Sequence, residues 1–192
     1  MKNLLPAVRM LLIFTILTGV IYPVFVTGIA QVFYPAQANG SLITVGETVV
    51  GSALIGQTVN EARYFQGRPS EINSMQADSP ILTASSGSNA GATNLIFIQT
   101  VADRDAAVRA TYNLAEDADV PADLLYASGS GLDPHISLRS AQLQAARIAE
   151  ARGMVLTDVE ALIDRFTERP QFGIFGENRV NVLLLNLALD HE

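Results

Sequence analysis

The chain has 192 residues, a formal net charge of −7 and no cysteine. Two of its 12 basic residues lie within the first nine positions, and all 19 acidic residues come later, so the rest of the chain has a balance of −9. A domain with this charge is a poor candidate for binding nucleic acid or anionic lipid headgroups. The absence of cysteine fits an exported domain without disulfides.

The most apolar stretch runs over residues 11–33, and no charged residue occurs between Met10 and Gly46. As a helix, residues 11–33 would reach about 34 Å, which is enough to cross a hydrocarbon core of about 30 Å. We therefore predict a transmembrane helix over these residues. Pro23 lacks the N–H that would bond back one turn, so we expect a kink or local unwinding near it.

The residues on either side of this stretch predict whether it is cleaved and how it is oriented in the membrane. Residues 36–38 (AQA) fit the cleavage pattern of a secretory signal, but the apolar run is longer than the roughly 7–15 residues of such a signal, so we favour an uncleaved anchor. Lys2 and Arg9 precede the helix, and the next basic residue is Arg63. Positive-inside bias then places residues 1–10 in the cytoplasm and the domain outside.

The rest of the chain is predicted to form a linker and one domain. Residues 34–48 contain Pro, Asn and Gly and indicate a short linker. Residues 49–192 suffice for a single core, and we predict an extracytoplasmic α/β (α+β) domain on the single N-terminal transmembrane helix. Its first half is predicted to hold a strand over 49–59 that is bulged near Gly51 or Gly56, a loop over 71–94, a helix over 101–116 and a strand over 120–127.

The second half of the domain carries clearer helix signals. Ser137 is a natural N-cap and Gly153 a natural stop, so we predict a helix over 138–152 with an apolar stripe. Its stripe residues are Ala141, Ala145, Ile148 and Ala149. A capping box of Thr157 and Glu160 predicts a second helix that ends near residue 168. Residues 171–179 read as an aromatic turn, and the leucine-rich end, 180–190, suits either a strand or a short buried helix.

Two segments rich in glycine and serine are the candidate functional loops. Residues 85–94 (SSGSNAGATN) could form an anion nest or a partner surface, or simply a long turn-rich connection. Residues 128–137 (SGSGLDPHIS) precede a helix, as phosphate cradles do. However, the chain has no G-x-x-x-x-G-K-[ST] motif, and its one lysine is Lys2.

Other chemistry is weakly indicated. Asp133, His135 and Ser137 are the residue types of a hydrolase triad, but three neighbours on one loop rarely align for that reaction. Two histidines without cysteine make no metal cluster, so we expect no metal site. Arg68 could bind a carboxylate or a carbonyl, although an ordinary surface arginine is the simpler interpretation.

Several motifs converge on a known family. In chain order they are GQ at 56–57, YFQGRPS at 64–70, SSGSNAGATN at 85–94, VPAD at 120–123, SGSGLDPHIS at 128–137 and VNVLLLNLALD at 180–190. With the N-terminal anchor, they make essentially the whole chain resemble the C subunit of the Kdp potassium-transporting ATPase. Ala92, Leu138 and Asn178 stand where that family often carries proline.

The resemblance implies a single-span subunit of a complex in the bacterial inner membrane. The implied partners are a channel-like potassium-binding subunit, a P-type ATP-hydrolysing subunit and a very small hydrophobic subunit. The chain itself would be no enzyme, and it lacks the D-K-T-G phosphorylation motif. In the family this subunit is needed for assembly, and it has been proposed to act as a catalytic chaperone that raises the ATP affinity of the hydrolysing subunit.

The resemblance also nominates residues. The candidates for contact with ATP are Ser128, Gly129, Ser130, Gly131, Asp133 and His135. The candidates for contact with partner subunits are Gln57, Arg68, Ser88, Asn89 and Asn94. We expect no firmly bound cofactor, because the predicted topology places both loops opposite to the cytoplasmic ATP and favours a structural or channel-capping role. The alternatives are a membrane-anchored extracytoplasmic binding or sensory domain and an anchored enzyme.

Overall fold

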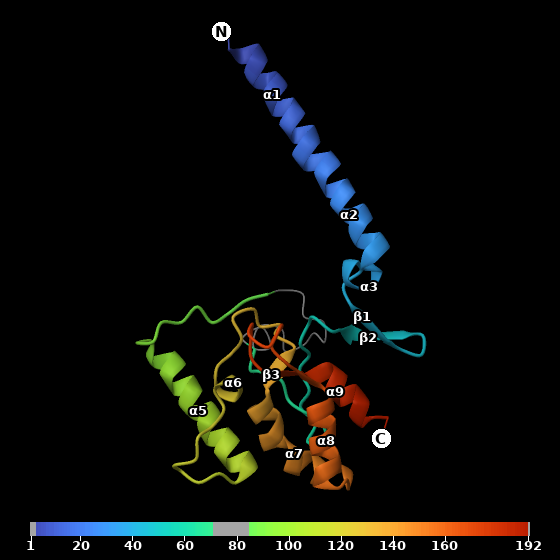
Figure 1. Cartoon of the computed structure of the whole chain (residues 1–192). Helices are drawn as coiled ribbons and strands as arrows, with labels where there is room; N and C mark the ends of the chain where they lie inside the picture. The colour runs from blue at the N-terminus through green and yellow to red at the C-terminus, as the bar shows by residue number, and fades with distance from the viewer. Residues whose placement is uncertain (1–2, 71–84, 192) are drawn as a thin grey trace. The chain divides into compact units, whose positions relative to one another are not determined.

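A computed structural model describes residues 3–70 and 85–191 of the chain, so the prediction for 71–84 lies outside the described residues. Its contacts divide the chain into two compact units, with the boundary between Ser52 and Ala53. We call them unit 1 and unit 2 and describe each by itself. Both units are drawn in Figure 1.

Unit 1 begins with a long apolar helix made of α1 (Leu4–Ile16), a π-helical turn (Leu17–Ile21) and α2 (Tyr22–Phe33). It has 30 residues, and within the described part of the chain it is the one helix that is long and apolar enough to cross a membrane. The π turn lies just before Pro23. The proline has no N–H to bond back, and the local change of geometry predicted there takes the form of this wider turn.

The segment predicted to be a linker is folded. It contains α3 (Pro35–Ala38) and β1 (Leu42–Val45), which pairs antiparallel with β2 (Thr48–Ser52). Ile43 lies opposite Gly51 and Thr44 opposite Val49, so one extra residue forms the bulge predicted near Gly51. The predicted strand over 49–59 ends early, at Ser52, because the chain then leaves the hairpin.

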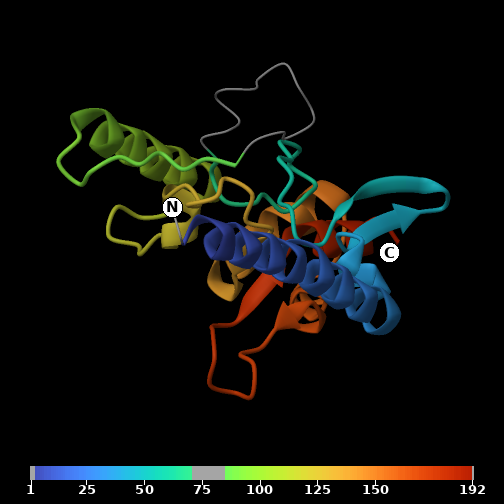
Figure 2. The same ribbon diagram turned by 90° about the horizontal axis from the view of Figure 1, so that it is seen from above.

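Unit 2 combines helices with one small sheet, which supports the α+β expectation. Its helices are α5 (Leu95–Tyr112), α6 (Ala122–Leu125), α7 (Leu138–Arg152), α8 (Leu156–Arg165) and α9 (Val182–Leu189). Its strands are β3 (His135–Ser137), β4 (Thr167–Glu168) and β5 (Arg179–Asn181), in the antiparallel order β3-β5-β4. Figures 1 and 2 show α5 at one side of this unit and α9 at the other.

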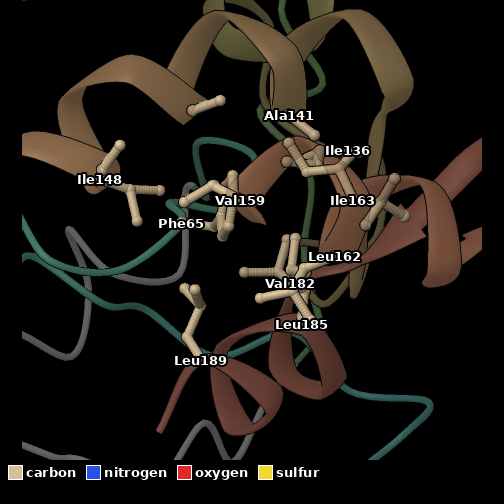
Figure 3. Packing of buried hydrophobic residues seen from close by; sticks show 13 residues of the cluster. Phe65, Ile136, Ala141, Ile148, Val159, Leu162, Ile163, Val182, Leu185 and Leu189 are labelled. Atoms are coloured by element: carbon tan, nitrogen blue, oxygen red, sulfur yellow. The ribbon is translucent and has the colours of Figure 1, made fainter. Parts of the chain in front are cut away.

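The core lies between α7, α8, α9 and the sheet. Figure 3 shows side chains of these helices pointing toward one another around Phe65, which is fully buried. The four residues of the predicted apolar stripe of α7 are all buried in this core. The ends of α7 are also as predicted, since Ser137 Oγ accepts a hydrogen bond from the Ser140 N–H and Gly153 has a φ of +66°.

In the first half of unit 2 one prediction is wrong, and another has the wrong bounds for a helix that is present. The strand over 120–127 is instead a helical turn, α6, because Pro121 begins it and the Tyr126 N–H bonds back to the Ala122 carbonyl. The helix predicted over 101–116 is present, but it begins at Leu95 and ends at Tyr112. The Asn94 side chain caps its start by accepting from the N–H groups of Ile96 and Phe97.

Two predictions near the C-terminus need correction or completion. The capping box of Thr157 and Glu160 is wrong, because α8 begins one residue before Thr157 and no side chain caps it. That helix ends at Arg165, where the chain turns into β4. The ambiguous end of the chain contains both structures, a strand up to Asn181 and then α9, which the Asn181 side chain caps.

Candidate functional site

The candidate site rests on an extended segment that two buried amides hold in place. Asn186 of α9 accepts from the Phe65 N–H (2.8 Å) and donates to the Phe65 carbonyl (2.9 Å). Gln144 of α7 accepts from the Gln66 N–H (2.8 Å) and donates to the Gln66 carbonyl (3.0 Å). These amides take the place of a neighbouring strand, so the backbone of residues 65 and 66 stays paired inside the core.

Residues 128–135, here called the glycine-rich loop, pack against three other segments of unit 2. The backbone of the loop is bonded to residues 56, 69–70 and 85–86. The bonds are Ser128 N–H to the Pro69 carbonyl (3.2 Å), Ser70 Oγ to the Gly131 carbonyl (2.8 Å), Ser86 N–H and Ser85 Oγ to the Ser130 carbonyl (3.0 and 2.9 Å), and Gly56 N–H to the Leu132 carbonyl (2.8 Å). The loop therefore joins segments that lie far apart in the sequence.

Glycines on the neighbouring segments allow this close packing. A Cβ on Gly56 would lie 2.4 Å from the backbone oxygen of Asp133, and a Cβ on Gly87 would lie 2.7 Å from the backbone oxygen of Gly129. Both separations are too short for a side chain without movement of the backbone. Each of these glycines belongs to one of the family motifs, and each allows two backbone segments to lie in contact.

Arg68 and Asp133 form an ion pair across this packed region. Arg68 Nη1 lies 2.9 Å from Asp133 Oδ2, and the two side chains are 26% and 30% exposed. The other carboxylate oxygen of Asp133 accepts from the His135 N–H at 3.0 Å. Arg68 is therefore bound to a carboxylate of its own domain, rather than being the ordinary surface arginine of the simpler interpretation. The ion pair fixes the end of the YFQGRPS motif to the glycine-rich loop.

His135 lies between two carboxylates. Its Nδ1 is 3.6 Å from Asp133 Oδ1, and its Nε2 is 3.6 Å from Glu168 Oε1. Among the residues that the structure describes, no group of three His, Cys, Asp or Glu side chains could hold a metal ion.

Ser137, the third residue of the triad pattern, is directed to a different partner. Its Oγ donates to Asp123 Oδ1 at 3.0 Å, and its N–H donates to Asp123 Oδ2 at 2.7 Å. The hydroxyl of Ser140 donates to the same carboxylate at 2.6 Å. Asp123 thus anchors the first turn of α7. Sequence reasoning missed this role, although Asp123 ends the VPAD motif, because that motif was assigned to a strand.

The predicted partner contacts do not form one cluster of free side chains. Arg68 is engaged by Asp133, and Asn94 caps α5. Gln57, Ser88 and Asn89 are exposed, and Asn89 has a φ of +49°, which asparagine tolerates better than most residues.

A second polar cluster ties the C-terminus to residues 63 and 64. Arg152 donates to the Arg63 carbonyl (2.7 Å) and to Asp190 (2.8 Å), and the Tyr64 hydroxyl also donates to Asp190 (2.9 Å). Partial burial would raise the pKa of Asp190, but the hydrogen bonds from Arg152 and Tyr64, with the charges of Arg152 and Arg63, lower it below its ordinary value. A cavity of about 370 Å³ lies beside the cluster and is lined by Arg63, Ala151, Arg152, Met154 and Leu189, none of which belongs to the glycine-rich loop.

Two exposed apolar groups were missed as functional candidates. One is at the start of α5, where Leu95 is 80% and Ile96 79% exposed. The other follows β4, where Phe172, Ile174 and Phe175 are 91%, 78% and 67% exposed. The sequence predicted a turn for the second group, with Gly173 and Gly176 beside its aromatic residues, but not the exposure of those residues.

Comparison with known proteins identifies the family. The family model described as "K+-transporting ATPase, c chain" matches residues 4–191. The chain belongs to the KdpC family. Curated relatives named "Potassium-transporting ATPase KdpC subunit" include that of Mycobacterium tuberculosis strain H37Rv, which is 49% identical over 189 residues and covers 98% of both chains. The relative from Methylococcus capsulatus is 51% identical over 185 residues and covers 96% of this chain and 95% of its own.

Membership in the KdpC family confirms the resemblance drawn from the motifs. It makes the chain a subunit of a K+-transporting ATPase, and thus a component of an ion-transport complex. The apolar helix at the N-terminus is consistent with a membrane location.

Proposed function

We propose that the chain is a non-catalytic accessory subunit that supports assembly and stability of a high-affinity, ATP-driven potassium uptake complex. Its helix would anchor it in the bacterial inner membrane, with the N-terminus in the cytoplasm and unit 2 outside. The proposed partners are the channel-like potassium-binding subunit, the ATP-hydrolysing subunit and the small hydrophobic subunit. Family membership and the long apolar helix at the N-terminus support this role.

The observation that carries the proposal is the internal packing of the glycine-rich loop. The carbonyls of Ser130, Gly131 and Leu132 accept bonds from other segments of unit 2, and Asp133 is paired with Arg68. A phosphate cradle instead directs backbone N–H groups toward an open anion site. We therefore assign the loop a structural role. Any increase in the ATP affinity of the hydrolysing subunit would pass through the complex, without direct contact between ATP and this loop.

Cysteine labelling tests the orientation, because the chain has no native cysteine. Ser130 is exposed in unit 2, and Asn3 is exposed at the start of the long helix. Ser130→Cys should react with a membrane-impermeant maleimide in cells whose inner membrane is intact. Asn3→Cys is the matched control and should react only after the membrane is opened. The reverse pattern would overturn the proposed topology.

Co-purification and photolabelling test the role itself. The tagged full chain, purified in mild detergent, should bring with it a P-type ATPase subunit. In that complex a photoreactive ATP analogue should label the ATPase subunit and leave this chain unlabelled. Labelling within residues 128–135 would restore direct ATP contact. Purification of the chain without any partner would favour the alternative of an anchored binding or sensory domain.

A further inference from the structure

The loop between β4 and β5 holds a small, strongly exposed apolar group. We call Phe172, Ile174 and Phe175 the apolar tip; they are 91%, 78% and 67% exposed. Figure 2 shows the orange loop that carries them extending away from the helices of unit 2. Scattered apolar residues are normal on a protein surface, but three large ones within four positions on a projecting turn call for a partner.

The tip is held outward by an ordered turn. The Gln171 N–H donates to the Phe175 carbonyl (2.9 Å), the Phe175 N–H donates back to the Gln171 carbonyl (3.0 Å), and the Gly173 N–H donates to the Pro170 carbonyl (3.0 Å). Phe172 has a φ of +54°, in the left-handed region that bulky side chains rarely adopt. The turn therefore maintains a strained backbone in which the aromatic side chain faces solvent.

Hydrogen bonds within each unit tie down the chain on either side of the boundary between Ser52 and Ala53. Within unit 1, the Ser52 hydroxyl donates to the Gly40 carbonyl (2.7 Å), so the hairpin brings residue 52 back beside residue 40, seven positions after Phe33. Within unit 2, Asn181 of β5 donates to the carbonyl of Ala53 (2.8 Å). The strand that follows the tip is thus bonded to the first residue of unit 2. Asn181 lies six positions after Phe175, a span of at most about 20 Å.

The local charge also differs from that of the whole chain. Residues 165–179 contain three arginines and two glutamates, whereas the chain has a net charge of −7. Glu168 and Arg179 form an ion pair at 2.9 Å, so these two residues add no net charge beside the tip. Aromatic and aliphatic side chains with arginine near their base are typical of segments at the boundary between lipid and water.

The size of the tip decides between a lipid and a protein partner. A stable protein interface needs roughly 800 Å² on each side, whereas a large aromatic side chain offers only about 150–250 Å². Three side chains are too few for such an interface, but they suffice to orient a domain that its own helix already holds at a bilayer. We propose that the apolar tip inserts into the lipid–water interface of the membrane that the N-terminal helix spans.

Tryptophan fluorescence tests this insertion, because the chain contains no tryptophan. Phe172→Trp in the full chain would be reconstituted in vesicles of phosphatidylethanolamine and phosphatidylglycerol, with and without brominated acyl chains. We expect blue-shifted emission and loss of most of the fluorescence in the brominated vesicles. Leu95→Trp, at an 80% exposed position on α5, is the matched control and should keep its intensity there. Phe175→Trp provides a second reporter if the first variant folds poorly.

The same measurement on the complex gives the decisive outcome. Bromine quenching of the tip reporter, both for the chain alone and with its co-expressed subunits, supports lipid insertion. Blue-shifted emission without bromine quenching in the complex would show that a protein surface covers the tip, and red emission would show that water does; either result overturns the proposal. The outcome does not depend on which side of the membrane unit 2 occupies, so it can fail independently of the proposed function.

Discussion

The glycine-rich loop and the apolar tip differ in where their polar and apolar groups find partners. In the loop, carbonyls and the Asp133 carboxylate are engaged by other segments of the same unit. In the tip, the backbone hydrogen bonds lie within the turn itself, while the side chains of Phe172, Ile174 and Phe175 are exposed. The polar groups of the loop are therefore paired within the domain. The tip has exposed apolar surface, and burial of such surface is worth about 25 cal/mol per Å².

This difference shows where to look for contacts with the outside. The loop attracts attention in the sequence, because glycine, serine and histidine before a helix are residues of many binding sites. Its structure gives those residues internal partners. The tip is less conspicuous in the sequence, but its exposed apolar side chains would be buried by a partner. The mutations below test each side of this comparison, beginning with the largest expected effect.

Asn186→Leu should have the largest effect, because it removes the amide that pairs the buried backbone of Phe65. An N–H and a C=O lose their partner, at a cost of about 1–3 kcal/mol each, so we expect the free energy of unfolding to fall by roughly 2–5 kcal/mol. Urea unfolding of the full chain in detergent, followed by circular dichroism, measures it. Asn60→Leu, at an exposed position, should change it by less than about 0.5 kcal/mol. Equal losses would contradict the role of Asn186.

Gly56→Ala should have the next largest effect and tests the packing of the glycine-rich loop directly. The added Cβ would lie 2.4 Å from the Asp133 carbonyl oxygen, so the loop must move and the bond from Gly56 to Leu132 must lengthen. Such overpacking typically costs about 1–3 kcal/mol. Gly91→Ala is the matched control, because its Cβ would meet nothing within 4 Å. If both variants unfold alike, the loop is less tightly packed than we describe, and its assignment as a scaffold fails.

The sequence predicted the parts of the fold that local signals determine. The helix at 138–152 was predicted with its observed ends, because Ser137 and Gly153 act within one turn of the residues they cap. The apolar helix was predicted by length and composition. At residues 180–190, apolar residues occupy almost every position, so the leucine pattern could not distinguish a strand from a helix.

The remaining features depend on contacts between distant residues. The VPAD segment is typical of a strand in sequence. It forms a helical turn instead, which Pro121 begins and in which Asp123 accepts a hydrogen bond from Ser137. The engagement of residues 128–135 by residues 56, 69–70 and 85–86 has no counterpart in any local spacing. The exposure of the tip could not be predicted either, because the burial of an aromatic residue in a turn depends on where the neighbouring elements lie.

The smallest effect on the free energy of unfolding is expected for Phe172→Gly. We expect this change to stabilise the chain, whereas the changes at Asn186 and Gly56 destabilise it. At 91% exposure the aromatic ring contributes little burial within the domain, while its φ of +54° is strained for a bulky residue and accessible to glycine. Relief of this strain is worth about 1 kcal/mol or more, and the greater freedom of glycine in the unfolded chain offsets part of it. We therefore expect unit 2 to gain up to about 1 kcal/mol in detergent.

Phe172→Ala keeps the strained backbone and removes the same ring, so it should leave the free energy of unfolding within about 0.5 kcal/mol of the parent chain. The same denaturant unfolding measures both variants. A residue kept at a cost to its own domain is one whose benefit lies in a contact outside that domain, which is the role proposed for the tip. If Phe172→Gly instead destabilised the chain as much as Gly56→Ala, Phe172 would pack within the domain, and the contrast between loop and tip would be lost.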